Sequence, residues 1–360
     1  MKFLFRVDAS VSIGSGHIMR CLTLATALRA RGVSCHFVSR KHDGHLIELV
    51  RQRGFEVTAL VAGHAAPPDD DGPVHASWLG CTWESDAERT RALAVTMKPD
   101  WIVLDHYALD ERWERFVSVA GTRLLVIDDL ADRTHACDLL VDQNLGRAAA
   151  HYSALVPDGC SVLAGPAYAL LRPEFARLRP VSLARRNGAT LRHILVNMGG
   201  VDQPNATGAV LAALCASDLP PDCRISVVMG MQAPWIAEVQ AFATRMSWAT
   251  EVLVNISDMA ERMADSDMAI GAAGSTSWER CCLGLPTLMV ILAANQESSA
   301  AALDDVGAAL LLGHVGDIPR RLPAALTDVM QPDRLRQISD AASALVDGHG
   351  VERLLHALGM

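Results

Sequence analysis

Strand-like apolar runs alternate with helical patterns along the chain, and this alternation limits its possible folds more than any other feature. In the first part of the sequence, apolar runs occur at 2–7, 35–39, 56–61, 101–104, 124–128, 138–141 and 161–164. Helical patterns lie between most of them, at 17–31, 44–53, 83–98 and 110–120. This order predicts parallel strands joined by crossover helices, as in α/β domains.

The same alternation begins again near residue 190. Strands are expected at 192–197, 224–229, 251–254, 267–270, 287–291 and 308–311. Helices are expected at 205–216, 234–246, 258–265, 275–284, 296–304, 316–328, 332–345 and 350–358. A chain of 360 residues is too long for one ordinary domain. We therefore predict two α/β lobes with parallel sheets and a cleft between them.

The predicted boundaries follow the composition of the chain. The first lobe covers 1–163 and the second covers 190–345. Residues 164–189 carry three prolines and many arginines without a continuous period, which indicates an interdomain linker with a short helix at 173–178. The C-terminal segment 346–360 is expected to form a helix that packs back on the first lobe.

Composition and charge exclude several classes of protein. Half of the residues are hydrophobic and 20% are charged, and the formal net charge of −9 argues against a nucleic-acid or anionic membrane surface. No apolar run approaches the roughly 18 residues that span a bilayer, and Arg6 and Asp8 come too early for a signal peptide. Nine cysteines without a Cys-x-x-Cys pair indicate reduced thiols in a cytoplasmic protein. No His/Cys/Asp spacing resembles a metal site, and Ala65 to Gly72 are expected to form a solvated loop.

The residues Gly14-Ser15-Gly16-His17 follow the first strand and open the first helix. Ligands bind at the carboxyl ends of strands in open α/β sheets. Gly14 and Gly16 let the backbone approach a ligand, and His17 carries the side chain whose ordinary pKa is nearest to neutral pH. The spacing is not Gly-x-Gly-x-x-Gly, because Met19 occupies the third glycine position, and it is not a P-loop. A histidine that only caps or packs the helix explains this pattern equally well.

A loop nearly free of side chains follows a strand in the second half. Gly271–Gly274 lead into a helix that starts with Ser275 and Thr276. Such a loop admits phosphate oxygens to backbone N–H groups and hydroxyls, and Glu279, one turn later, can accept hydrogen bonds from ribose hydroxyls. The alternative is a plain helix start with Ser275 as N-cap and Glu279 as a carboxylate favoured by the helix dipole, which leaves the bare loop unexplained.

Three further positions belong to the same predicted edge of the second sheet. Gly199 and Gly230 each follow a predicted strand, and each is also compatible with an ordinary turn. Asn295 follows the strand at 287–291 and either faces a ligand or caps the next helix.

Blocks of sequence along nearly the whole chain match, in order, those of one enzyme family. They are RVDASVSIGSGHIMRCLTLA at 6–25, DHYALDERW at 105–113, DDLADRTHACDLLVDQN at 128–144, AGPAYALLRPE at 164–174, NMGGVD at 197–202, DMAIGAAGSTSWERCCLGLP at 267–286, and Asn295-Gln296. As a set they resemble the hydrolases of pseudaminic acid biosynthesis, which cleave UDP-2,4-diacetamido-2,4,6-trideoxy-β-L-altropyranose. The loop at 62–80 and the C-terminal tail match none of these blocks.

The resemblance implies a GT-B architecture, in which two Rossmann-like lobes hold a UDP-sugar and the C-terminal lobe binds the UDP. It also implies hydrolysis at the anomeric carbon with inversion, without metal or cofactor. His17 falls on the family's catalytic histidine, the general base. Tyr107 and Asn295 fall on positions linked to sugar binding or catalysis, and Glu279 falls on the nucleotide-ribose position.

The chemistry is compatible with a single histidine. UDP is already a good leaving group near neutral pH, so its departure needs charge stabilisation rather than a general acid. The remaining task is to activate and aim a water at C1, which suits His17. Attack from the side opposite UDP gives inversion. Asp8 or Asp105 is expected to orient His17, and each is equally compatible with a capping role.

Two other functions fit the same predicted lobes. A GT-B glycosyltransferase would move the sugar to an acceptor instead of water, and a nucleotide-sugar binding protein would not turn the substrate over. A nicotinamide-linked epimerase is disfavoured because the sequence has no dinucleotide fingerprint. The sequence leaves the stereochemistry of the sugar and the oligomeric state open.

Overall fold

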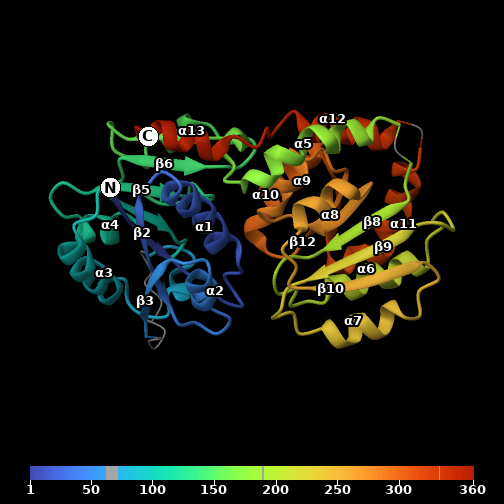
Figure 1. The fold of residues 1–360 in the computed structure, drawn as a ribbon, viewed down its shortest axis with the longest axis horizontal. Helices are drawn as coiled ribbons and strands as arrows, with labels where there is room; N and C mark the ends of the chain where they lie inside the picture. Colours follow the sequence, from blue (N-terminus) through green and yellow to red (C-terminus); the bar gives the residue numbers. More distant parts are fainter. Residues whose placement is uncertain (62–71, 189, 332) are drawn as a thin grey trace. The chain divides into compact units, whose positions relative to one another are not determined.

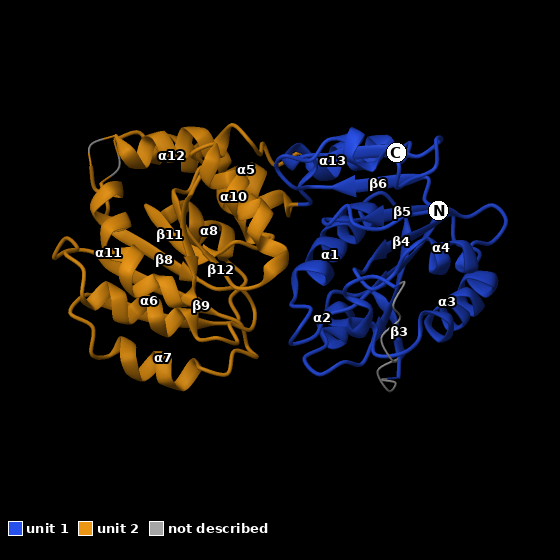
Figure 2. Cartoon of the chain, turned by 180° about the vertical axis from the view of Figure 1, so that it is seen from behind, with its two compact units in different colours: residues 1–170, 350–360 blue, residues 171–349 orange. Residues whose placement is uncertain are grey.

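The structure is a computed structural model, and it describes residues 1–61, 72–188, 190–331 and 333–360. The chain divides into two compact units (Figure 2). Unit 1 comprises Met1–Leu170 and Gly350–Met360, and unit 2 comprises Leu171–His349. Most of the solvated loop predicted for Ala65 to Gly72 lies outside the described residues.

Unit 1 is built on a parallel sheet with the strand order β3-β2-β1-β4-β5-β6-β7. Figure 1 labels β2, β3, β5 and β6 of this sheet. Its strands are β1 (Lys2–Val7), β2 (Ser34–Arg40), β3 (Glu56–Leu60), β4 (Trp101–Asp105), β5 (Arg123–Ile127), β6 (Leu139–Asp142) and β7 (Ser161–Ala164). The direction of winding changes between β1 and β4. Such a switch point is where open α/β sheets bind their ligands.

Helices cover both faces of this sheet. They are α1 (Gly16–Arg29), α2 (Ile47–Gln52), α3 (Trp83–Met97), α4 (Glu111–Val117) and α13 (Gly350–Ala357), with short 3₁₀ helices η1 (Ala76–Leu79), η2 (Ala149–Tyr152) and η3 (Pro166–Tyr168). Successive residues of a strand point to opposite faces. Phe3, Phe5 and Val7 accordingly share a core with α1 and α13, whereas Leu4 shares a core with α3 and α4.

Unit 2 repeats the plan with the strand order β10-β9-β8-β11-β12-β13. Its strands are β8 (His193–Asn197), β9 (Arg224–Met229), β10 (Ala249–Val254), β11 (Met268–Ala272), β12 (Thr287–Ile291) and β13 (Leu310–His314). Its helices are α5 (Pro173–Arg186), α6 (Ala206–Cys215), α7 (Ile236–Ala243), α8 (Met259–Asp265), α9 (Thr276–Cys282), α10 (Glu297–Asp305), α11 (Ile318–Val329) and α12 (Arg334–Ser343), with η4 (Ala294–Gln296) and η5 (Val315–Asp317). The switch point of this sheet lies between β8 and β11.

The linker predicted at 164–189 is wrong over most of its length. Residues Pro173–Arg186 form the continuous helix α5, although Pro180 lies inside it. Tertiary contacts hold this helix: Phe175 is fully buried, and Arg179 donates hydrogen bonds to three backbone carbonyls of unit 2. The sequence pattern suggested irregular structure because proline cannot donate a backbone hydrogen bond within a helix. The tertiary contacts of Phe175 and Arg179 compensate for that lost hydrogen bond.

The remaining predicted strands and helices agree with the structure to within a few residues. The last helix, α13, contacts α1 and η3 within unit 1. In the part of the chain that the structure describes, no helix is both long and apolar enough to cross a membrane.

Candidate functional site

The carboxyl edge of the unit 1 sheet carries a row of buried carboxyl groups. Asp8 follows β1, Asp105 ends β4, Asp128 follows β5 and Asp142 ends β6, and all of them are 0% exposed. Pairing of Val7 with Asp105 shows that β1 and β4 end at the same level. Because a buried carboxylate is costly unless it is paired, the surrounding side chains must supply cations or protons.

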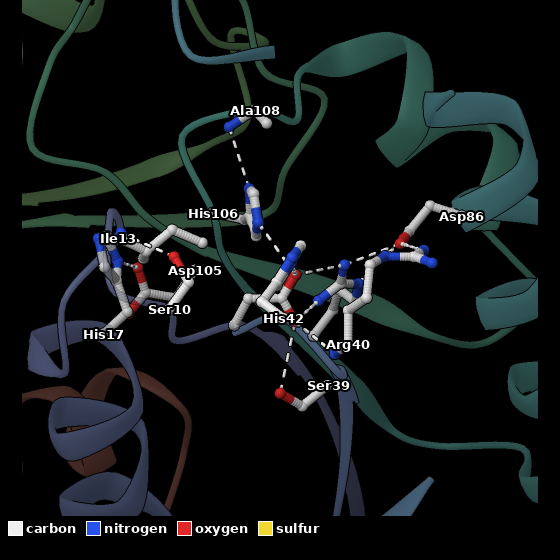
Figure 3. A network of polar contacts seen from close by, with 12 residues as sticks. Ser10, Ile13, His17, Ser39, Arg40, His42, Asp86, Asp105, His106 and Ala108 are labelled. Atoms are coloured by element: carbon white, nitrogen blue, oxygen red, sulfur yellow. Dashed lines mark hydrogen bonds and ion pairs between the residues drawn. The ribbon is translucent and has the colours of Figure 1, made fainter. Parts of the chain in front are cut away.

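His17 joins this row from the first turn of α1. Its Nδ1 atom lies 2.5 Å from Oδ1 of Asp105. Arg20, three residues later on the same helix, donates two hydrogen bonds to that carboxylate, from Nε to Oδ2 and from Nη2 to Oδ1, both at 2.7 Å. Residues three apart lie on the same face of a helix, which explains why both side chains reach one partner. Figure 3 shows His17 beside Asp105.

The charge of Asp105 decides which ring nitrogen of His17 carries the proton of their hydrogen bond. Burial by itself would raise the pKa of Asp105, but Arg20 and His17 beside it lower that pKa well below its ordinary value. An ionised carboxylate only accepts hydrogen bonds, so Nδ1 of His17 carries the proton of this pair. This tautomer leaves the lone pair on Nε2, the geometry of a general base, on a side chain that is 9% exposed.

Tyr107 packs against the other side of this arrangement. Its ring meets the ring of His17 edge to face, with 4.5 Å between centroids and 80° between planes. Its hydroxyl donates to Oδ2 of Asp129 at 2.5 Å, and Arg20 donates to the same oxygen at 2.6 Å. Burial, with Asp129 nearby, raises the pKa of Tyr107 well above its ordinary value, so the phenol stays protonated.

Asp8 belongs to a different network, in which His42 and His106, both labelled in Figure 3, approach its carboxylate. Arg6 donates to both of its oxygens, at 2.6 and 2.9 Å. His42 and His106 approach Oδ2 at 3.2 and 3.1 Å. Burial opposes the charge of Asp8, but Arg6 and the two imidazoles lower its pKa well below the ordinary value, so its charge neutralises a buried arginine.

The sequence left two carboxylates open as partners of His17, and the structure brings Asp105 and not Asp8 to the imidazole. The pleat of the strands explains the choice. Val7 points toward α1, so Asp8, the next residue, points to the opposite face. Asp105 points to the same face of the sheet as Val103, two residues earlier, and Val103 packs in the core shared with α1. Asp105 therefore faces α1 and His17.

The loop before α1 is held in a tight turn. Gly14 donates from its backbone N–H to the carbonyl of Ser10 at 2.8 Å and has φ +79°, which favours glycine. A Cβ at Gly14 would meet no described atom within 4 Å, so this surface is open. Gly16 is the first residue of α1.

In unit 2 the predicted phosphate loop lies beside the switch point of the sheet. Of the predicted loop Gly271–Gly274, the first two residues end β11 and the last two lead into α9. Ser275 is exposed, and its side chain makes no capping hydrogen bond within the described helix. A Cβ on Gly274 would lie 3.6 Å from Nε2 of Gln296. The loops after β11 and β12 are therefore neighbours at one edge.

A buried cation lies under this loop. Arg280 is 2% exposed and donates to the carbonyl of Ala272 at 2.7 Å and to the hydroxyls of Thr276 and Ser277 at 3.1 and 3.0 Å. Among the described atoms its Nε has no hydrogen-bond partner. Burial lowers the pKa of Arg280 to about 10, which leaves it charged at neutral pH.

Glu279 lies one turn into α9, as the sequence predicted for a ribose-binding group. Its side chain is 17% exposed, and Arg172 lies 3.7 Å from Oε1. Burial raises the pKa of Glu279 to about 7, although Arg172 and Arg280 oppose this shift. The carboxyl group is therefore poised to change charge near neutral pH.

Close backbone packing explains why residue 230 is a glycine. A Cβ on Gly230 would lie 2.0 Å from the backbone oxygen of Gly200, so the loops after β8 and β9 touch backbone to backbone. Gly199 has φ +83° and open space around a Cβ in the described structure. Asn295 is exposed in η4, and Gln296 occupies the N-cap position of α10 without a side-chain capping hydrogen bond.

The sequence reasoning missed several residues of these sites. Arg20 and Asp129 complete the arrangement around His17, and Arg280 lies beneath the loop predicted to bind phosphate. An arginine on the apolar face of an amphipathic helix, as Arg20 is on α1, was the available signal, because a buried cation needs an anionic partner. Among the described residues no group of His, Cys, Asp and Glu side chains could hold a metal ion.

Comparison with known proteins supports the fold. Residues 215–353 match the glycosyltransferase family 28 C-terminal domain. The crystal structure of MurG from Acinetobacter baumannii superposes with a TM-score of 0.72 at 14% identity, covering 99% of both chains. The predicted fold class, two α/β lobes with parallel sheets in a GT-B architecture, is confirmed.

Two curated relatives match most of the chain. One, from Campylobacter jejuni, is named UDP-2,4-diacetamido-2,4,6-trideoxy-β-L-altropyranose hydrolase and is 28% identical over 308 residues, 85% of this chain and 97% of that protein. The other is an uncharacterised protein of Methanocaldococcus jannaschii, 26% identical over 294 residues. That match covers 81% of this chain, which spans only 55% of the length of the archaeal protein.

Proposed function

We propose that the chain is a UDP-sugar hydrolase. It acts without a metal, inverts the anomeric centre, and releases UDP and a free 2,4-diacetamido-2,4,6-trideoxy hexose of the altrose type. His17 is the general base, and Tyr107 and Asn295 serve the sugar. The observation that carries this proposal is the buried arrangement of His17, Asp105 and Arg20, because it presents a basic Nε2 at the switch point of a parallel sheet.

The proposed step balances without a further reactant. A water oxygen forms a bond to C1 of the sugar while the bond between C1 and the diphosphate oxygen breaks. The proton of the water passes to Nε2 of His17, and the electron pair of the broken bond leaves with UDP. Asp105 stabilises the imidazolium that forms, which then returns its proton to solvent.

The proposal assigns UDP to unit 2. The backbone of Gly271–Gly274 and the hydroxyls of Ser275 and Thr276 bind the diphosphate, and Glu279 accepts hydrogen bonds from the ribose. Arg280 supports an anionic ligand here, because a buried guanidinium that donates only to neutral groups gains from a nearby negative charge. The Thr276 hydroxyl accepts a hydrogen bond from Arg280, so its own proton is free to be donated to a phosphate oxygen.

The choice of sugar and of water as acceptor rests on likeness. The Campylobacter relative, whose name specifies this substrate and hydrolysis, matches 85% of the chain. Tyr107 lies in a sequence block shared with that family and contacts His17 directly. A sugar held beside Tyr107 would therefore lie next to the proposed base.

The test is a proton NMR time course with the UDP-linked altrose derivative and no added acceptor. The wild-type protein is expected to release UDP and one first-formed anomer, of inverted configuration. H17A should lower turnover by at least about 100-fold while leaving the dissociation constant of UDP unchanged. The matched control is H36A, because His36 is also in unit 1 but pairs with Glu56 and Thr58.

Two results would contradict the proposal. Full turnover by H17A would remove the general base from the mechanism. A first product with retained configuration would require a covalent or front-side route that the His17 geometry does not supply.

A glycosyltransferase that uses the same donor is the second candidate, and the match of residues 215–353 to a glycosyltransferase domain favours it. The catalytic base would then deprotonate an acceptor hydroxyl instead of water. Slow release of free sugar that accelerates at least about tenfold when an acceptor extract is added, with the sugar recovered on that acceptor, would support transfer over hydrolysis.

A further inference from the structure

A short segment beside His17 has no part in the function proposed above. Residues 72–80 include η1 and belong to the stretch that matches none of the family's sequence blocks. This segment contributes two aromatic side chains, His75 and Trp78, to the neighbourhood of the proposed base.

The rings of His75 and Trp78 cover Tyr107. Trp78 stacks on Tyr107 with 6.0 Å between centroids and 29° between planes. The ring of His75 lies 5.6 Å from that of Tyr107 and 4.4 Å from that of Trp78. The ring of Tyr107 also packs against that of His17, with 4.5 Å between centroids. The aromatic rings therefore form one continuous cluster that ends at the proposed base.

The segment, and not Tyr107, supplies the surface of this cluster. Tyr107 is only 5% exposed, whereas His75 and Trp78 are half-buried. Leu79 anchors the segment in the core at 1% exposure. Backbone hydrogen bonds at 2.9 Å, from Ala76 to Pro73 and from Trp78 to His75, hold the turn in one shape.

The surface is electrically neutral although it adjoins a charged network. Burial lowers the pKa of His75 below its ordinary value, so the ring is uncharged at pH 7. Arg133, whose guanidinium lies 6.0 Å from the centre of the Tyr107 ring, is already paired with Asp128 at 2.8 Å. The faces of aromatic rings offer few hydrogen-bond partners, so an apolar group packs against them at a lower cost than a hydroxyl group does.

We propose that His75 and Trp78 form an aromatic wall that selects the sugar, packing the deoxy methyl group and an acetamido methyl group while C1 faces His17. Aromatic side chains with a few polar groups are the usual lining of small-molecule sites. A hydroxymethyl group in place of the methyl would leave a hydroxyl unpaired against this wall. The identity of the sugar rests on the function proposed above, but the wall is tested separately.

The variants are W78A, W78F and H75A, with W83A as matched control. Trp83 lies five residues from Trp78, is also half-buried, and packs against Phe116 and Arg112 instead of Tyr107. In steady-state kinetics W78A should raise KM for the UDP-linked trideoxy sugar by about tenfold, and W78F should have a KM close to that of the wild-type protein. The affinity for UDP alone should not change in any variant, and W83A should match the wild-type protein.

Binding is measured independently of turnover by saturation-transfer NMR. The H17A background keeps the UDP-sugar intact, and irradiation of the aromatic protons should transfer saturation to the sugar methyl groups. The transfer should fall at least about threefold in H17A/W78A and stay constant in H17A/W83A. The KM for UDP-N-acetylglucosamine, which carries a hydroxymethyl group, should differ less between W78A and the wild-type protein than the KM for the trideoxy sugar does.

Each outcome decides one of the two proposals. If methyl saturation in the H17A protein depends on Trp78 but the wild-type protein hydrolyses nothing, the wall is supported and the hydrolase is rejected. Hydrolysis with KM and methyl saturation unaffected by W78A rejects the wall and leaves the hydrolase standing. Absence of methyl saturation in the H17A protein also overturns the wall.

Discussion

The two units carry candidate sites at equivalent places in similar sheets, yet the sites are built from opposite materials. At the switch point of unit 1, aspartates, arginines and histidines pair with one another in the core. At the switch point of unit 2, a loop of small residues covers one buried guanidinium that donates only to neutral groups. Equivalent topology therefore does not imply equivalent chemistry.

The difference agrees with the function that we propose for each site. Proton transfer needs a group held in one tautomer, and Asp105 with Arg20 holds His17 in that state. Recognition of a phosphate group needs accessible backbone N–H groups and a cation that has no anionic partner. The loop before α9 supplies the first, and Arg280 supplies the second. A site whose charged groups are all paired suits proton transfer, and a site with a cation that lacks an anionic partner suits the binding of an anion.

The largest effect is expected from removing the charge that orients the imidazole. D105N preserves shape but gives His17 a neutral partner, so the wrong tautomer becomes accessible and kcat should fall by about 10²–10⁴-fold. The control is D8N, which breaks the pair with Arg6 in the neighbouring network. D8N should lower the unfolding midpoint but leave turnover per folded molecule within about threefold.

That pair of variants can also break the comparison. Equal losses of kcat in D105N and D8N, measured at temperatures where both proteins are folded, would mean that the charged networks of unit 1 act as one unit. The distinction between a catalytic pair and a structural one would then be abandoned.

The next effect concerns Arg280, the buried cation beneath the loop that precedes α9 in unit 2. R280M removes the charge under the phosphate loop, and the dissociation constant of UDP should rise by about tenfold or more while that of uridine changes little. R186M is the control, since Arg186 is also buried, donates to backbone carbonyls, and has its pKa lowered by burial to about 10. Calorimetric titration with both ligands measures the difference. Equal weakening of uridine and UDP by R280M would show that Arg280 only shapes the loop.

The smallest effect is a pH dependence in nucleotide binding. Burial raises the pKa of Glu279 to about 7, and only the ionised carboxylate accepts hydrogen bonds from both ribose hydroxyls. The dissociation constant of uridine should therefore rise by about tenfold as the pH falls from 8 to 6. In E279Q the affinity should be lower and nearly independent of pH over the same range. A flat profile in the wild-type protein would separate Glu279 from the ribose.

Local sequence patterns predicted most of the fold. The alternation of apolar runs and helical periods is a property of neighbouring residues, and it placed the strands of both sheets within a few residues. It failed at α5, where Pro173 and Pro180 suggested irregular structure. The helix depends on contacts of Phe175 and Arg179 with distant segments, which local pattern cannot express.

The candidate sites were predicted unevenly for the same reason. His17 and the loop at 271–274 stand out because a polar or bare segment interrupts an apolar strand and opens a helix. The position of Arg20 on the apolar face of its helix signals an anionic partner, but only the fold shows that this partner is Asp105, 85 residues away in the sequence. His75 and Trp78 carry no pattern, and only their stacking on Tyr107 distinguishes them.

The sequence by itself determined the elements, their parallel arrangement and the strand ends where chemistry gathers, because these follow from the spacing of apolar and small residues. Only the tertiary structure decided which carboxylate meets His17, since that depends on the face of the sheet to which each strand residue points. It also decided that Arg280 is buried beneath the unit 2 loop. Those pairings set the charge and tautomer of the groups, and hence their chemistry.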